Sequence, residues 1–355
     1  MGMEKYRMNP DNGLEFGLYT LGDHLSNPHT NERISAQQRL NEMIEMARLA
    51  DDAGIDLISV GESHQEYFTS QAHSIVLAAI SQATKNIKIS SSSTIISTSD
   101  PVRVFEDFAT LDLLSNGRAE IVAGRASRVG LFDLLGYDLQ DYEELFEEKF
   151  ELLLKLNEEE IVNWEGEFRA PLKDAHILPR PKNGSLPIWR AVGGTTASAM
   201  KAAYQGVPMY QAMLGGTASV FKRPIDAYRM TLEDQGYDPK DFPVATAGFF
   251  YAADSTQQAQ REYYPHINEG MKVTNGRGFP KQLFAQAAHK ESVINIGSAQ
   301  EIIEKILYQH EQFNHQRYIA QLDFGGVPFD KIMRNIELIG NDILPAVKKY
   351  TAKKD

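Results

Sequence analysis

The 355-residue sequence contains no cysteine, which excludes disulfide bonds, thiolate nucleophiles and cysteine-ligated metals. It has no apolar run near the roughly 18 residues that a membrane-spanning helix needs. Its first residues, MGMEKYRMNPDNG, also lack the apolar stretch of a signal peptide. We therefore expect a cytoplasmic protein with no membrane partner.

Positive charge is scarce as well. The 48 acidic residues outnumber the 36 lysines and arginines, and the net charge is −12. Proteins that bind nucleic acid need clustered lysine and arginine to neutralise phosphates, so no nucleic acid is expected as a partner. Much of the acidic excess lies in residues 143–160, where leucine and phenylalanine recur at helical spacing, which is typical of the solvated face of a helix.

Several motifs of known chemistry are missing from the sequence. There is no P-loop, no dinucleotide-binding glycine fingerprint and no nucleophile elbow. Aspartate, glutamate and histidine form no cluster at metal-ligand spacing, so no metal site is expected.

Strand-like and helix-like segments alternate along the chain. The predicted strands are residues 15–21, 55–61, 87–96, 118–124, 186–192, 207–213, 243–253 and 317–326. Ser35, Asp100 and Ser298 are predicted helix caps, and Gln38 and Glu301 complete capping boxes with the first and the last. Eight strands, each followed by a helix, predict an α/β fold, a single (β/α)8 TIM barrel with insertions, and an open doubly wound sheet is the rival.

No linker or change of composition divides the chain, so residues 1–355 are expected to form one domain. Two excursions interrupt the alternation. Residues 164–187 are rich in proline and are expected to be irregular, and residues 262–292 have weak periodicity and are expected to form a mobile excursion.

In barrels of this kind the chemistry lies on the loops at the carboxyl ends of the strands. This rule selects residues 23–24, 61–67, 97–100, 124–127, 193–198, 215–216 and 324–326. The strongest signal among them is WRAVGGTTASAMKAA at residues 189–203. Its glycines allow close backbone approach, its helix start offers N–H groups to an anion, and Thr195 and Ser198 add hydroxyls. A tight turn with a plain threonine cap explains the same residues equally well.

GRAS at residues 124–127 is a second candidate anion loop. The planar guanidinium of Arg125 suits a phosphate, although an arginine after a strand is more often a surface ion-pair residue. Two such loops on one face of the barrel favour a phosphorylated cofactor or substrate.

Two further segments carry polar side chains at the predicted site. In GESHQEY, residues 61–67, Glu62 and His64 are candidates for acid–base catalysis or for a hydrogen-bonded rim. The run SSSST at residues 90–94 contradicts strand propensity, which a ligand with polar edges or bonds to neighbouring backbone would explain.

The sequence resembles the bacterial luciferase-like flavin-dependent monooxygenase family over nearly its whole length. The resemblance lies in FGLYTLGDH (16–24), GIDLISVGESH (54–64), the block from IKISSSSTII to IVAGRAS (87–127), PIWRAVGGTTASAMKAA (187–203) and RYIAQLDFGGVPFDKIMRNIELIGNDILPAV (317–347). It implies that reduced FMN binds at the strand ends and that one oxygen atom from O2 is transferred to a small organic substrate.

The resemblance also implies roles for individual residues. Arg125, the backbone of Gly194 and Thr195, and the hydroxyl of Ser198 would hold the FMN phosphate. The isoalloxazine would lie against the third strand, where family members have a non-proline cis peptide bond and this chain has Ser92–Ser93. After the second strand, family members often have Glu-His-His, whereas this chain has Glu62-Ser63-His64, so light emission is in doubt and His64 is the candidate replacement base.

The implied partners are O2, a separate NAD(P)H:flavin reductase and a second copy of the chain in a homodimer. Two enzyme alternatives remain: hydride transfer with a reduced deazaflavin coenzyme, and a sugar-phosphate lyase or isomerase, for which no strand-end lysine is found. A non-catalytic flavin-binding or partner-subunit protein is the alternative from another class.

Overall fold

The computed structural model describes residues 2–353, and its centre is a closed barrel of eight parallel strands, as predicted. The barrel strands are β1 (Glu15–Thr20), β2 (Leu57–Val60), β3 (Lys88–Ser91), β5 (Ala119–Gly124), β8 (Ile188–Val192), β9 (Met209–Met213), β10 (Val244–Ala253) and β12 (Arg317–Gln321). Each pairs with the next along the chain, and β12 pairs with β1, which closes the barrel.

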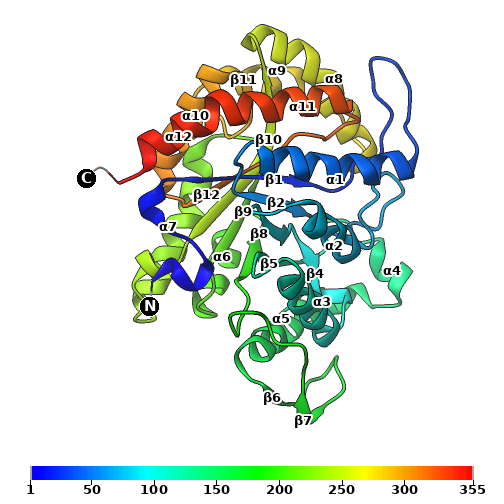
Figure 1. The fold of residues 1–355 in the computed structure, drawn as a ribbon, viewed down its shortest axis with the longest axis vertical. Coiled ribbons are helices and arrows are strands. Elements are labelled where there is room, and N and C mark those ends of the chain that lie inside the picture. Colours follow the sequence, from blue (N-terminus) through cyan, green and yellow to red (C-terminus); the bar gives the residue numbers. More distant parts are fainter. Residues whose placement is uncertain (1, 354–355) are drawn as a thin grey trace.

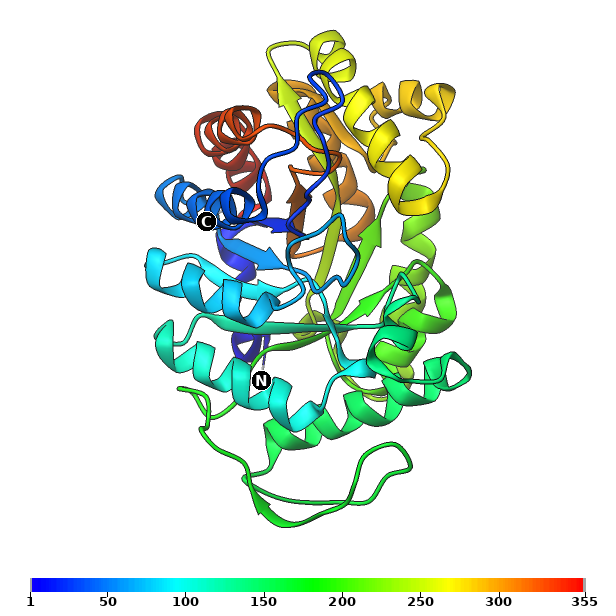
Figure 2. The same ribbon diagram turned by 90° about the vertical axis from the view of Figure 1, so that its right-hand side faces the viewer.

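The helices lie outside the strands, as Figure 1 and the turned view in Figure 2 show. They are α1 (Ala36–Asp52), α2 (His73–Ala83), α3 (Pro101–Leu114), α4 (Leu131–Leu135), α5 (Tyr142–Glu158), α6 (Thr196–Tyr204), α7 (Ala218–Asp234), α8 (Thr256–Asn275), α9 (Lys281–Ala285), α10 (Ala299–Phe313), α11 (Phe329–Leu338) and α12 (Leu344–Thr351). Within residues 2–353, no helix combines the length and the apolar composition needed to cross a bilayer.

The predicted caps begin three of these helices. Asp100 accepts a hydrogen bond from Val102 N (2.8 Å) at the start of α3, and Ser298 and Glu301 form a complete capping box at α10. The box predicted at α1 is only half formed. Ser35 accepts from Gln38 N (3.1 Å), but the Gln38 side chain donates to Glu42 (2.9 Å) instead of returning to the cap.

A buried ionic network fills the amino-terminal end of the barrel. Arg317 on β12 donates to both carboxylate oxygens of Glu120 on β5 (2.7 and 3.1 Å) and to Glu15 on β1 (2.9 Å). Trp189 on β8 also donates to Glu120 (3.1 Å). The side chains of Arg317 and Glu120 are 1% and 0% exposed. These charged groups therefore satisfy one another and are not available to a ligand.

The predicted third strand, residues 87–96, is broken in two. β3 ends at Ser91, and a separate two-residue strand, β4 (Thr94–Ile95), pairs with β5. The peptide bond between the intervening Ser92 and Ser93 is cis, at the position that the family resemblance implied. The run of serines therefore coincides with an interruption of the strand.

The first excursion is more regular than its sequence indicated. β6 (Ile161–Trp164) and β7 (Leu172–His176) form an antiparallel hairpin, which lies below the barrel in Figure 1. Most of its side chains are exposed, so no apolar alternation identifies the strands in the sequence.

The second excursion is largely helical. Residues 262–292 include most of the twenty-residue helix α8 and all of α9. Pro265 lies inside α8 and its polar residues outnumber its apolar ones, which explains the weak periodicity. A further strand, β11 (Asn295–Ser298), pairs in parallel with the second half of β10. It was not predicted, because it is only four residues long and its last residue belongs to the capping box of α10.

Candidate functional site

A cavity of about 280 Å³ lies at the carboxyl ends of the barrel strands. Its lining comes from most of the strands and from α8, namely Tyr19, Leu21, Glu62, Ser92, Ser93, Ile95, Arg125, Ser127, Arg128, Ala191, Tyr210, Ala212, Leu214, Ala247, Phe249, Met271, Thr274, Asn275, Gln321 and Phe324. Much of this wall is apolar, and the polar groups are concentrated in a few places. Four of the predicted site residues, Glu62, Ser92, Ser93 and Arg125, face this one space.

The structure brings the two predicted anion loops together. Arg125, directly after β5, donates through Nη2 to the hydroxyl of Ser198 in the first turn of α6 (3.2 Å). Thr195 is the N-cap of α6 and accepts from Ser198 N (3.2 Å). Gly194 has φ +100°, and around Gly193 no atom lies within 4 Å of where a Cβ would stand. The turn therefore faces open space beside a guanidinium and a helix amino terminus.

Arg125 also has an acidic partner within the protein. Its Nη1 forms a salt bridge with Glu143 of α5, and Lys201 Nζ lies 3.4 Å from the other oxygen of this carboxylate. The guanidinium lies 5.5 Å from the centre of the Phe146 ring, so its apolar faces are partly covered. The edge of the guanidinium is thus shared between Glu143 and Ser198 and is held near the glycine turn.

Two glycines make room for the cis peptide, one directly after β2 and one at the end of β5. A Cβ on Gly61 would lie 2.2 Å from the Ser92 carbonyl oxygen, and one on Gly124 would lie 2.3 Å from Ser93 Oγ. Ser92 Oγ forms a 2.6 Å hydrogen bond with the hydroxyl of Tyr210. Burial raises the pKa of Tyr210, so this phenol stays protonated at the cavity wall. The serine pair is therefore a fixed ridge that projects into the cavity.

Glu62 connects three segments at the cavity edge. Its Oε2 accepts from Ile95 N (2.7 Å), its Oε1 lies 2.8 Å from His64 Nε2, and its backbone N–H donates to Ser93 O (2.9 Å). His64 is not among the lining residues of the cavity, but its hydrogen-bond partner Glu62 is. Ser63 donates to Gln65 Oε1 (2.7 Å), so its hydroxyl does not extend the Glu62–His64 pair.

Sequence reasoning missed several polar residues of the cavity, namely Thr274 and Asn275 of α8 and four on the strands or the loop after β5. Tyr19 and Gln321 are hydrogen-bonded to each other across neighbouring strands at 2.5 Å, and Tyr210 bonds Ser92 as described. They point inward from β1, β12 and β9, so side-chain alternation along the predicted strands was the signal that could have found them. Arg128 is the fourth, and it lies one residue beyond the selected segment 124–127.

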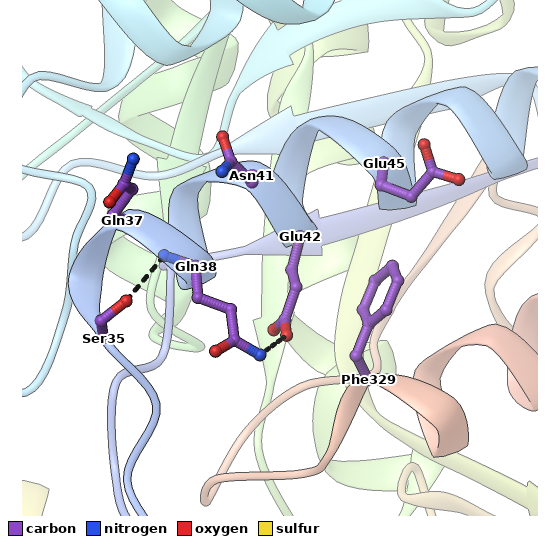
Figure 3. A pocket seen from close by; sticks show the side chains of 7 residues that line it. All are labelled: Ser35, Gln37, Gln38, Asn41, Glu42, Glu45 and Phe329. Atoms are coloured by element: carbon purple, nitrogen blue, oxygen red, sulfur yellow. Dashed lines mark hydrogen bonds between the residues drawn. The ribbon is translucent and has the colours of Figure 1, made fainter.

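A larger hollow, about 490 Å³, lies on the outer surface of the barrel beside α1 (Figure 3). It is lined by Ser35, Gln37, Gln38, Asn41, Glu42, Glu45 and Phe329. Figure 3 shows Ser35 capping the backbone of Gln38, and the Gln38 side chain bonded to Glu42. Polar groups at this hollow thus serve α1 itself, and we assign no ligand to it.

Comparison with known proteins identifies the family to which this barrel belongs. The family model described as luciferase-like monooxygenase matches residues 14–316. The chain belongs to the luciferase-like monooxygenase family. It is therefore an oxidoreductase of the luciferase-like kind, as the sequence resemblance implied. The matched residues include both anion loops and the serine ridge.

Two curated relatives match this luciferase-like chain at low identity and over nearly the full length of both proteins. It is 22% identical to the oxygenase component of a flavin-dependent trigonelline monooxygenase from Acinetobacter baylyi, covering 94% of this chain and 95% of the relative. It is 21% identical to the alkanal monooxygenase alpha chain of Photorhabdus luminescens, covering 89% and 94%.

Solved structures share the fold of the luciferase-like chain. The monooxygenase RslO1 from Streptomyces bottropensis has a TM-score of 0.82 and 22% identity, over 94% of this chain and 99% of that one. The oxygenating constituent of 3,6-diketocamphane monooxygenase from Pseudomonas putida, in complex with FMN, has a TM-score of 0.76, 17% identity and coverage of 94% and 98%. An F420-dependent secondary alcohol dehydrogenase has a TM-score of 0.72, 19% identity and coverage of 94% and 99%.

Proposed function

We propose that this protein is the oxygenase component of a two-component system, which takes up reduced FMN and uses O2 to oxygenate a small organic substrate. The observation that supports this most directly is the contact between Arg125 and Ser198 beside the open turn at Gly193 and Gly194. It is an anion site built at the mouth of a largely apolar cavity, which is what a flavin nucleotide requires.

The phosphate of FMN would be held by the Arg125 guanidinium, the Ser198 hydroxyl and the backbone at Gly194 and Thr195. Thr195 uses its oxygen as an acceptor to cap α6, but its O–H is still able to donate to an anion. The amino terminus of α6 adds a favourable dipole, and the turn at Gly193 has space for the ligand. The donor set therefore fits a phosphate.

The isoalloxazine would lie against the ridge of Ser92 and Ser93, between apolar walls such as Phe249. Reduced flavin supplies the activation of O2, and the chain supplies orientation and a dry cavity. Met271 of α8 contributes an apolar side chain to the lining, while Tyr210 is hydrogen-bonded to Ser92.

Glu62 and His64 are the proposed acid–base pair. The Glu62 side chain lines the cavity, and the His64 imidazole lies behind it at hydrogen-bond distance. A proton is able to pass between the imidazole and the cavity only through the carboxylate or by movement of the loop. We therefore assign the direct contact with ligand to Glu62 and a positioning and proton-holding role to His64.

The proposal implies partners outside the chain. No dinucleotide fingerprint occurs in the sequence, so a separate NAD(P)H:flavin reductase would supply reduced FMN. The trigonelline monooxygenase relative is itself described as an oxygenase component. A homodimer is expected from the resemblance, and a cytoplasmic location is proposed because no apolar run is long enough to span a membrane.

The test is a titration of the purified protein with FMN, followed by flavin fluorescence, together with O2 uptake when a flavin reductase and NADH supply reduced FMN. We expect saturable FMN binding and O2 uptake that increases with a suitable substrate. Absence of FMN binding would overturn the proposal.

A second candidate is hydride transfer with a deazaflavin coenzyme and without O2. It is favoured by the F420-dependent dehydrogenase among the structures that share this fold. The same anion site suits either coenzyme, so the two candidates differ in the ring system that binds. Tight binding of F420 together with failure to bind FMN would replace the first proposal by the second.

A further inference from the structure

The cavity holds a second cation that has no role in the proposed phosphate site. Arg128 lines the cavity, and its guanidinium lies 5.1 Å from the centre of the Phe68 ring, in the loop after β2. Arg125, in contrast, reaches toward Ser198 of α6, which follows β8. The two guanidinium groups therefore leave the same loop in different directions.

Arg128 differs from Arg125 in its ionic contacts. Among the residues that the structure describes, no carboxylate forms a salt bridge with it, and its one hydrogen bond is a 3.3 Å contact from Nη1 to Ser127 Oγ. Its Nε is buried without a hydrogen-bond partner. Arg125 in the same loop is paired with Glu143, and Arg190 of β8 is paired with Glu147. A partly buried guanidinium beside an apolar wall is stabilised by an anion that forms charged hydrogen bonds with it.

The surroundings of Arg128 indicate the nature of that anion. Tyr19 of β1 lines the same cavity, and burial raises the pKa of its phenol, so this side chain stays neutral. Leu21, Phe249 and Phe324 line this cavity too and provide an apolar surface. This combination suits a molecule with an apolar body and one anionic group.

We infer that Arg128 is a specificity-determining residue that binds the carboxylate of an organic-acid substrate, on the side of the cavity away from the phosphate site. This inference rests on the proposed function only in assigning the remainder of the cavity to the flavin ring. It assigns one arginine to the cofactor and the other to the substrate. A neutral molecule of the same shape would leave Arg128 unpaired and would bind more weakly.

Benzoate and benzamide are suitable probes, because they have nearly the same shape and differ in charge. Calorimetric titration of each into the FMN-loaded protein measures the preference for the anion. We expect benzoate to bind about tenfold more tightly than benzamide, as one charge-assisted hydrogen-bond pair implies. In Arg128→Gln this preference should disappear, and in the control Arg103→Gln, on the exposed side of α3, it should remain.

The outcomes separate this inference from the proposed function. Failure of the wild-type protein to bind FMN overturns the proposed function, and the probe titrations are then read on the protein alone. A benzoate affinity no greater than that for benzamide, or a preference that survives in Arg128→Gln, overturns the inference. Loss of FMN affinity in Arg128→Gln as large as that in Arg125→Gln would also overturn it, because Arg128 would then belong to the cofactor site.

Discussion

At the scale of single residues, the structure concentrates its chemistry on Arg125. Its guanidinium contacts both the acidic helix α5 and the start of α6, through Glu143 and Ser198. Its stacking near Phe146 limits the directions in which its N–H groups point. An anion that reaches the glycine turn therefore meets a donor that is already oriented.

Replacement of Arg125 by alanine should weaken FMN binding. Loss of a charged hydrogen-bond partner costs about 2 kcal/mol, which is roughly thirtyfold in affinity. Fluorescence titration of FMN measures the change, and the exposed Arg103→Ala serves as the control. Unchanged affinity would remove Arg125 from the cofactor site.

Replacement of Glu143 by glutamine should have the opposite effect. Glu143 neutralises Arg125 in the free protein and would repel a bound phosphate, so its removal should tighten FMN binding. The side chain is 46% exposed, so we expect an increase of about two- to fivefold, greatest at low salt. Glu144→Gln, an exposed neighbour on the same helix, is the matched control. Weaker binding in Glu143→Gln would show that this carboxylate supports the site.

At the scale of elements, α8 is the part of the fold that covers the cavity. His266 of α8 is buried, and its Nδ1 lies 2.8 Å from the carbonyl oxygen of Gly325, in the loop after β12. The backbone contact is close, since a Cβ on Gly325 would lie 2.0 Å from His266 O. Burial lowers the pKa of His266 to about 4, although its hydrogen bond to Gly325 acts in the opposite direction.

The attachment of α8 should therefore weaken in acid. A released histidine takes up a proton below about pH 6.5, whereas the buried one resists protonation until about pH 4. The contribution of neutral His266 to the attachment of α8 is therefore complete above about pH 6.5. It is lost as the pH falls toward about 4. Hydrogen exchange of residues 256–275 at about pH 7.5 and pH 5, corrected for intrinsic rates, measures this. His266→Asn should remove the difference, and α6, which contains no histidine, should show none.

The sequence predicted the elements that carry apolar periodicity and clear caps. The eight barrel strands and most of the helices that follow them are of this kind, because burial on the barrel requires a continuous apolar face. β7 and α8 lack such a face, since β7 is mostly exposed and α8 is mostly polar and contains Pro265. Such elements are held by tertiary contacts, which a single sequence does not reveal.

The candidate site was predictable only where its residues follow strands. Arg125, Glu62 and the glycine turn were found by this rule, and their proposed roles await the experiments above. Tyr210 and Arg128 were not found. Tyr210 looks like an ordinary core residue of a strand, and the direction in which Arg128 points depends on the loop conformation, which no local pattern specifies.

At the scale of the whole molecule, the buried ionic network and the candidate ligand site lie at opposite ends of the barrel. The network of Arg317, Glu120 and Glu15 joins strands that are far apart in the sequence. Two further strands are connected to it by Trp189 and by Lys88, which pairs with Glu15. These contacts hold the amino-terminal end together without touching the cavity.

Replacement of Glu120 by glutamine should destabilise the fold without changing the site. Breaking a buried ion pair on one side costs about 3 kcal/mol, because Arg317 is left with an uncompensated charge. Thermal unfolding should shift downward by several degrees, while FMN affinity below the transition is unchanged. Glu106→Gln, in an exposed pair with Arg103, should leave both quantities unchanged. A stable Glu120→Gln protein would contradict this role for the network.

The length of β10 has a consequence for how this enzyme is able to diversify. Its first half pairs within the barrel, and its second half, from Phe250 to Ala253, pairs with β11. Residues 254–294, which connect β10 to β11, thus begin and end at two strands that are paired with each other. Insertions, deletions and substitutions between these two anchored ends leave the barrel pairing intact, so the range of accepted molecules is able to evolve separately from the framework.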